Sequence, residues 1–154
     1  FGSAFATAFF GLFIISEIAI LSNKYLRNIL HLSDLQLCNE HVTLKLRFSK
    51  TYQFGKGLVV SIRRSLESSV CFDLLKSFLQ CRSQEDGPFQ FSSVLHKALK
   101  FLGIETKTFK THSFRIGAAT HLYMSGISEQ EIPCKGRWIS DAYKNYIRPE
   151  FITF

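Results

Sequence analysis

The chain has 154 residues, enough for one domain with a sizeable core, and its composition gives no sign of a second domain. Hydrophobic residues make up 46% and charged residues 20%, which excludes a disordered tail or a fibrous repeat. The net charge of +7 favours a polyanionic partner such as nucleic acid, although a generally basic surface with no specific ligand explains it equally well.

An apolar stretch, residues 4–21, comes close to the length of a membrane span. Crossing a bilayer takes roughly 20 apolar residues, and Glu17 would cost about 2.5 to 3.5 kcal/mol at the centre of a spanning helix. We therefore expect a buried core helix over residues 3–21 and no membrane contact, followed by a short helix over residues 23–30. The chain begins with Phe1 and has no basic region typical of a signal peptide, which indicates a fragment.

The next part of the chain has the pattern of a β-hairpin. Apolar and polar residues alternate strictly over residues 42–48, which predicts a half-buried strand. Residues 58–62 predict its partner, and Gly55 and Gly57 between them can adopt a positive φ in a turn. A third strand within residues 31–37 would complete a small antiparallel sheet.

Helical spacing returns after the hairpin. One helix is expected over residues 69–82 and another over residues 92–102, with Gly103 ending the second. The residues of the first helix that we expect to face the core are Val70, Leu74, Leu75, Phe78 and Leu79. A polar loop, residues 83–88, connects the two helices.

Three shorter helices are expected in the last third of the chain. The first runs from residue 112 to about residue 125 and ends at Gly126. Residues 128–131 fit a capping box, but Pro133 inside the helix that follows should reduce it to one distorted turn. A short helix over residues 140–147 ends the pattern. The elements together predict a mostly helical α+β fold.

The four cysteines are widely spaced, with no CxxC pair and no histidine at zinc-finger spacing. They are Cys38, Cys71, Cys81 and Cys134. We expect free thiols in a reducing intracellular compartment, and neither a metal nor another cofactor.

His112 and Arg115 are the first candidates for a functional site. Residues three apart lie on one face of a helix, so the imidazole and the guanidinium would point at the same small volume. Such a volume suits a phosphate. This spacing alone is weak evidence, because it also occurs on many solvated helices.

Three sequence blocks strengthen the case considerably: HSFRIGAAT at residues 112–120, GRW at 136–138 and SDAYKNYIR at 140–148. In these blocks the chain resembles the tyrosine recombinases of phage-integrase type, most closely those of eukaryotic mobile elements. FFGLFIISEI at residues 9–18 and LRFSKTYQFGKG at residues 46–57 resemble two further motifs of the family. The resemblance implies that residues 1–154 form the catalytic domain, without the family's N-terminal helical core-binding domain.

The resemblance implies that a tyrosine hydroxyl attacks a DNA phosphodiester and forms a 3′-phosphotyrosyl link without metal or cofactor. Tyr146 matches the nucleophile. Arg115 and His112 would bind the phosphate, and Lys50 would be the general acid. Trp138 would shelter the site and offer its indole N–H, although a packed aromatic residue explains it too. Taken alone, Lys50 would be interpreted as a solvated turn lysine.

Ile14 departs from the family pattern, because it stands where the resemblance places the first catalytic arginine. Losing one donor of this kind typically lowers kcat by about 10² to 10³. We therefore expect weakened cleavage but retained binding of double-stranded DNA. We also expect self-association on DNA and a nuclear location. The candidate phosphate contacts are Arg63, Arg64, Lys97, Lys100, Lys107, Lys110 and Arg148, although each alone is more simply a solvated charge.

Four alternatives remain open from the sequence. The chain could be an inactive DNA-binding remnant of a mobile element, or a protein-interaction domain whose basic surface is incidental. A type IB topoisomerase would use the same nucleophile, but the GRW and YIR blocks fit it less well. Tyr143 is a second candidate for the nucleophile, although it more simply packs or stacks.

Overall fold

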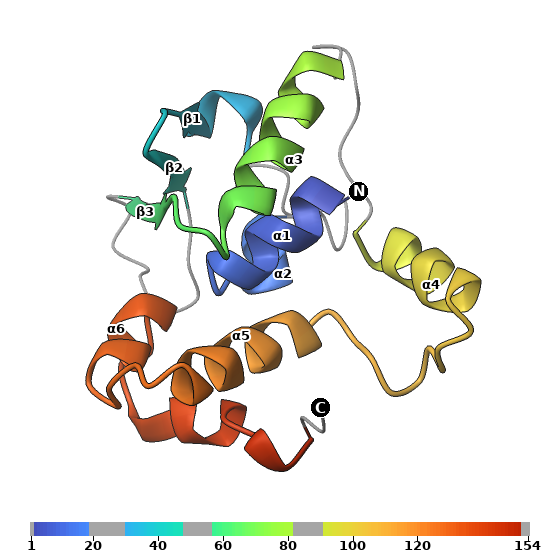
Figure 1. Cartoon of the computed structure of the whole chain (residues 1–154), viewed down its shortest axis with the longest axis vertical. Helices are drawn as coiled ribbons and strands as arrows, with labels where there is room; N and C mark the ends of the chain where they lie inside the picture. The colour runs from blue at the N-terminus through green and yellow to red at the C-terminus, as the bar shows by residue number, and fades with distance from the viewer. Residues whose placement is uncertain (1, 19–29, 48–56, 82–90, 152–154) are drawn as a thin grey trace.

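The computed structural model describes residues 2–18, 30–47, 57–81 and 91–151 (Figure 1). Its helices are α1 (Gly2–Phe10), α2 (Ile15–Ile18), α3 (Ser69–Cys81), α4 (Phe91–Phe101), α5 (Ser113–Met124) and α6 (Glu131–Gly136). Its strands are β1 (Leu35–Leu37), β2 (His41–Leu46) and β3 (Leu58–Arg63). Three 3-10 turns complete it: η2 (Leu32–Asp34), η3 (Asp141–Tyr146) and η4 (Pro149–Phe151). The expected helix over residues 23–30 lies outside the described residues.

The three strands form one antiparallel sheet in the order β1-β2-β3. The alternation in β2 places Val42, Leu44 and Leu46 in the core, as predicted. The third strand is shorter than expected because residues 32–34 form η2 instead. The carboxylate of Asp34 in η2 accepts hydrogen bonds from the His31 amide at 2.9 Å and from Arg47 Nε at 2.7 Å, which holds the turn against β2.

The predicted helix over residues 3–21 is wrong, because α1 ends at Phe10 and α2 begins at Ile15. The break lies at Leu12, which has a φ of 47° and therefore cannot continue a right-handed helix. Within the described part of the chain, no helix is long and apolar enough to cross a membrane.

The main core lies where the sheet meets α1 and α3. Phe13 and the inward residues of β2 and β3 pack there against Cys71, Phe72 and Leu75 of α3. The predicted core face of α3 is partly wrong, since Val70 is 55% exposed. Leu74 is also exposed. The buried face is instead centred on Phe72 and Leu75, which lie three residues apart on one side of the helix.

A second cluster joins α4 to α1 and α5. Leu95 and Leu99 of α4 pack against Ala8, with half-buried Phe5 and Phe114 beside them. Gly103, at a φ of 70°, follows the helix as predicted, and Gly126 has the same role after α5 at a φ of 79°.

The C-terminal elements gather around α5. Ser128 Oγ accepts from the Glu131 amide at 3.2 Å, the contact that the capping box predicts, although α6 itself begins at Glu131 with Gln130 as its N-cap. The last predicted helix is a 3-10 turn, η3, capped by Ser140. α5 contacts α1 as well as α6 and η3, so residues from both ends of the chain meet at this helix (Figure 1).

Candidate active site

His112 and Tyr146 are in direct contact. His112 precedes α5 at its N-cap position, Tyr146 is the last residue of η3, and the His112 Nε2 to Tyr146 Oη distance is 2.7 Å. Thr120 holds η3 against α5: its hydroxyl donates to the Tyr146 carbonyl at 3.1 Å and accepts from the Arg148 amide at 3.0 Å. Partial burial, followed by the charges of Arg115 and Arg148, lowers the pKa of His112. A neutral imidazole at this position can accept a proton from the phenol.

Tyr143, the other candidate nucleophile, has a different environment. Its side chain is in the core, and its hydroxyl points at Glu129 Oε2, 3.5 Å away. Burial and the carboxylate of Glu129 raise the pKa of Tyr143, which disfavours the phenolate. The contact with His112 and the lower burial therefore favour Tyr146.

Arg115 lies in the centre of the site and is only 3% exposed. Its Nη1 donates to the Leu12 carbonyl and its Nη2 to the Gly136 carbonyl, the latter at 2.5 Å. The guanidinium carbon lies 4.1 Å from the ring centroid of Trp138 and 5.8 Å from that of Tyr146. Burial, with the nearby Arg137 as a second cause, lowers the pKa of Arg115 to about 10, so it remains a cation at neutral pH.

Gly136 explains how Trp138 can approach so closely. A β-carbon at Gly136 would lie only 1.6 Å from a ring carbon of Trp138. The glycine of the GRW block therefore lets the indole lie over the backbone and reach both Arg115 and Tyr146, whose ring centroid is 5.2 Å away.

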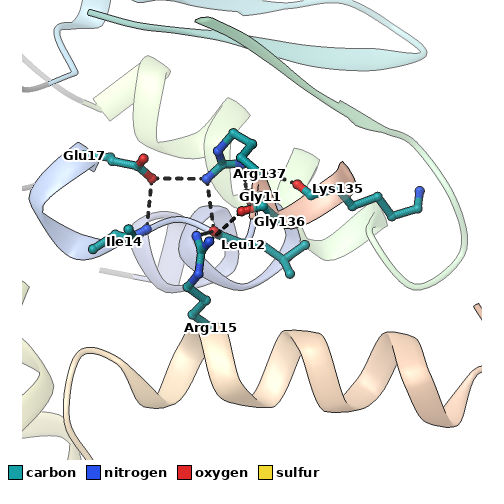
Figure 2. Close-up of polar contacts among 8 residues, drawn as sticks. All are labelled: Gly11, Leu12, Ile14, Glu17, Arg115, Lys135, Gly136 and Arg137. Atoms are coloured by element: carbon teal, nitrogen blue, oxygen red, sulfur yellow. Dashed lines mark hydrogen bonds and ion pairs between the residues drawn. The ribbon is translucent and has the colours of Figure 1, made fainter. Parts of the chain in front are cut away.

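Arg137 and Glu17 form an ion pair that was not predicted from the sequence (Figure 2). Arg137 follows α6 with a φ of 60°, and its Nη2 donates to Glu17 Oε2 at 3.1 Å. Glu17 is 3% exposed, and the same oxygen accepts from the Ile14 amide at 3.0 Å. The sequence did contain a signal for this ion pair. Glu17 is the single carboxylate in the apolar stretch of residues 4–21, and a buried charge needs a partner.

Both arginines bind the break between α1 and α2. Arg137 donates to the Gly11 carbonyl at 2.9 Å and to the Leu12 carbonyl at 3.0 Å, and Arg115 reaches the same Leu12 carbonyl from α5 (Figure 2). These bonds compensate for the helical hydrogen bonds lost at Leu12. The Nε atoms of both arginines are buried and have no partner among the described residues.

The structure thus brings together four of the five predicted site residues: His112, Arg115, Trp138 and Tyr146. Lys50 lies outside the described residues. Ile14, where the sequence resemblance expects an arginine, is half-buried next to the ion pair.

The cysteines lie apart from this site. All four thiols are free, and burial raises the pKa of Cys71 to about 11. No group of three potential metal ligands gathers among the residues that the structure describes.

The fold and the site together define a class of protein: a mostly helical α+β domain in which a His–Tyr contact lies beside a buried arginine. The chain matches the crystal structure of XerH site-specific recombinase bound to palindromic difH substrate, a post-cleavage complex, with a TM-score of 0.60 and 16% identity over 95% of this chain and 41% of that one. It also matches the Tn1549 transposon integrase in complex with circular intermediate DNA, with a TM-score of 0.62 and 13% identity over 99% of this chain and 54% of that one.

These similarities confirm the predicted α+β recombinase fold. The chain spans about half or less of the length of these two proteins. No family model matches the sequence, and no curated protein is significantly similar to it.

Proposed function

We propose that the chain is the catalytic domain of a tyrosine recombinase from a eukaryotic mobile element. It would cleave and rejoin double-stranded DNA through a 3′-phosphotyrosyl intermediate. The observation that carries the proposal is the 2.7 Å contact between Tyr146 Oη and His112 Nε2, beside the guanidinium of Arg115. Both similar solved structures contain DNA, which supports the same partner here. Action in the nucleus and self-association on DNA belong to this proposal.

In the proposed reaction the oxygen of Tyr146 attacks the phosphorus, and His112 Nε2 takes the phenol proton. A bond forms between Tyr146 Oη and phosphorus, and the bond from phosphorus to the 5′ oxygen breaks. The leaving oxygen takes a proton from a general acid, for which the sequence resemblance gives Lys50. Arg115 stabilises the charge that builds on the non-bridging oxygens, and the indole N–H of Trp138 is a further donor.

A second function, the inactive DNA-binding remnant, is favoured by two observations. Ile14 supplies no charge, and both terminal nitrogens of Arg115 already donate to backbone carbonyls. Two of the five N–H donors of Arg115 are therefore committed to the backbone of this chain, and the guanidinium is buried, which leaves fewer donors for a phosphate. Many phosphate contacts would still support binding.

A suicide DNA substrate separates these functions. It is a duplex with a nick near the cleavage point, so that the released fragment diffuses away and the protein stays attached. We expect an adduct that survives denaturing electrophoresis, with mass spectrometry locating the DNA on Tyr146. Salt-dependent DNA binding with no adduct would establish the remnant. If the chain neither binds DNA nor forms an adduct, the protein-interaction domain is the remaining alternative.

Substituting Ile14→Arg should raise the rate of adduct formation by about 10²-fold, since one missing charged donor typically costs 10² to 10³ in rate. The half-buried side chain begins next to Glu17, so the new guanidinium has a carboxylate nearby. The rate is measured by single-turnover trapping, with Ile14→Met as the uncharged control. An Ile14→Arg chain that folds and binds DNA but reacts no faster would contradict the assignment of this position.

A further inference from the structure

A basic hollow lies between α4 and the start of α5, outside the site described above. Its volume is about 390 Å³, and its lining residues are Leu95, His96, Thr106, Lys107, Lys110 and Thr111. Thr111 directly precedes His112, so the hollow adjoins the site along the chain. None of the four described candidate catalytic residues lines it.

Within the described ranges, no acidic residue compensates the charge of this hollow. Lys107, Lys110 and His96 are exposed, and none of the described lining residues carries a carboxylate. Neither lysine forms an ion pair with a described residue, in contrast to Arg47, Arg64, Arg137 and Lys144, each of which has an acidic partner. Two lysines held at one hollow without a counter-charge favour an anionic ligand.

The other lining groups suit a phosphate. Thr106 and Thr111 are half-buried and carry hydroxyls that can donate to phosphate oxygens. His96 and Lys100 are four residues apart on α4 and therefore share one face of the helix, which extends the basic surface beyond the hollow. In the part of the chain that the structure describes, no aromatic side chain lines the hollow to stack on a base.

We propose that this hollow binds a backbone phosphate of DNA other than the one that faces Tyr146. The inference rests on the proposed function and adds a contact that fixes the position of the duplex. Lysines act there as point charges that carry no sequence information, so the contact serves register and affinity on any sequence. The hydroxyls of Thr106 and Thr111 add direction to the charge.

The test compares the salt dependence of DNA binding, measured by anisotropy of a labelled duplex between about 50 and 200 mM salt. Each phosphate contact contributes about 0.9 to the slope of log K against log salt concentration. The double variant Lys107→Gln/Lys110→Gln removes the contact with one phosphate and should therefore lose about 0.9 of the slope. Equivalently, the unmodified chain should lose about threefold to fourfold more affinity over this range than the double variant does.

Two control variants make the result specific. Lys76→Glu removes the same two units of charge from an exposed position on α3 and should leave the slope unchanged. Lys107→Arg/Lys110→Arg keeps the charge and should keep the slope. Circular dichroism confirms that each variant is folded.

Three outcomes overturn the inference. An unchanged slope in the double glutamine variant, or an equal loss in Lys76→Glu, overturns it alone and leaves the proposed function standing. An unmodified chain that shows no salt-dependent binding to DNA overturns the inference and the proposed function together.

Discussion

Replacing Tyr146 with phenylalanine is expected to abolish the covalent adduct with DNA. The substitution removes the one oxygen that contacts His112 and lies beside Arg115, so no bond to phosphorus can form. The fold should persist, because losing one partly exposed hydrogen bond costs about 0.5 to 1.5 kcal/mol. The measurement is the shifted band of a labelled suicide duplex on a denaturing gel, together with the thermal midpoint of unfolding.

Tyr143→Phe is the matched control, since it removes a hydroxyl from the neighbouring tyrosine three residues earlier. Among the residues with a described position, that hydroxyl reaches Glu129 alone, at 3.5 Å, so the adduct should form at nearly the unmodified rate. Loss of the adduct in Tyr143→Phe, with an intact adduct in Tyr146→Phe, would reverse the assignment of the nucleophile.

Glu17→Ala should reduce the free energy of unfolding by about 3 to 5 kcal/mol, because it leaves the charge of Arg137 buried without its partner. It also leaves the Ile14 amide without an acceptor. A domain is typically stable by only 5 to 15 kcal/mol, so roughly a third of the total would be lost. Urea unfolding measures the change, with a lower midpoint and an unchanged m-value.

Two variants show whether the ion pair is the cause. Glu17→Gln keeps an oxygen for Ile14 and Arg137 and should lose less stability than Glu17→Ala. Combining Glu17→Leu with Arg137→Met removes both charges and should recover part of the loss. A double variant no more stable than Glu17→Ala would mean that the two side chains contribute independently.

The local spacing of apolar residues was sufficient to predict most of the strands and helices. The alternation in β2 and the helical spacing in α4 and α5 each depend on neighbours within a few residues, so the sequence predicts them directly. The sequence blocks that contain His112, Arg115, Trp138 and Tyr146 also indicated side chains that the structure places near one another, although His112 and Arg115 each contact Tyr146 rather than one another. The contact of His112 with Tyr146 joins residues 34 positions apart, and the sequence resemblance is what connected them.

The break in the first helix could not be predicted in this way. Residues 3–21 are apolar enough for one helix, and Gly11 is the local residue that weakens it, which by itself does not end a helix. The Leu12 carbonyl is instead bound by Arg115, 103 positions away, and by Arg137, 125 positions away. Only the folded chain brings these cations to Leu12, so the turn is a tertiary effect that overrides local propensity. The exposure of Val70 has the same origin, because packing against the sheet sets the rotation of α3.

The position of Trp138 gives this protein a built-in spectroscopic probe. It is the chain's only tryptophan, and its ring lies 4.1 Å from the Arg115 guanidinium and 5.2 Å from the Tyr146 ring. The tryptophan fluorescence of the protein therefore comes from the space between Tyr146 and α5. Titrating the unlabelled protein with an oligonucleotide would report on that space alone, without background from other indoles.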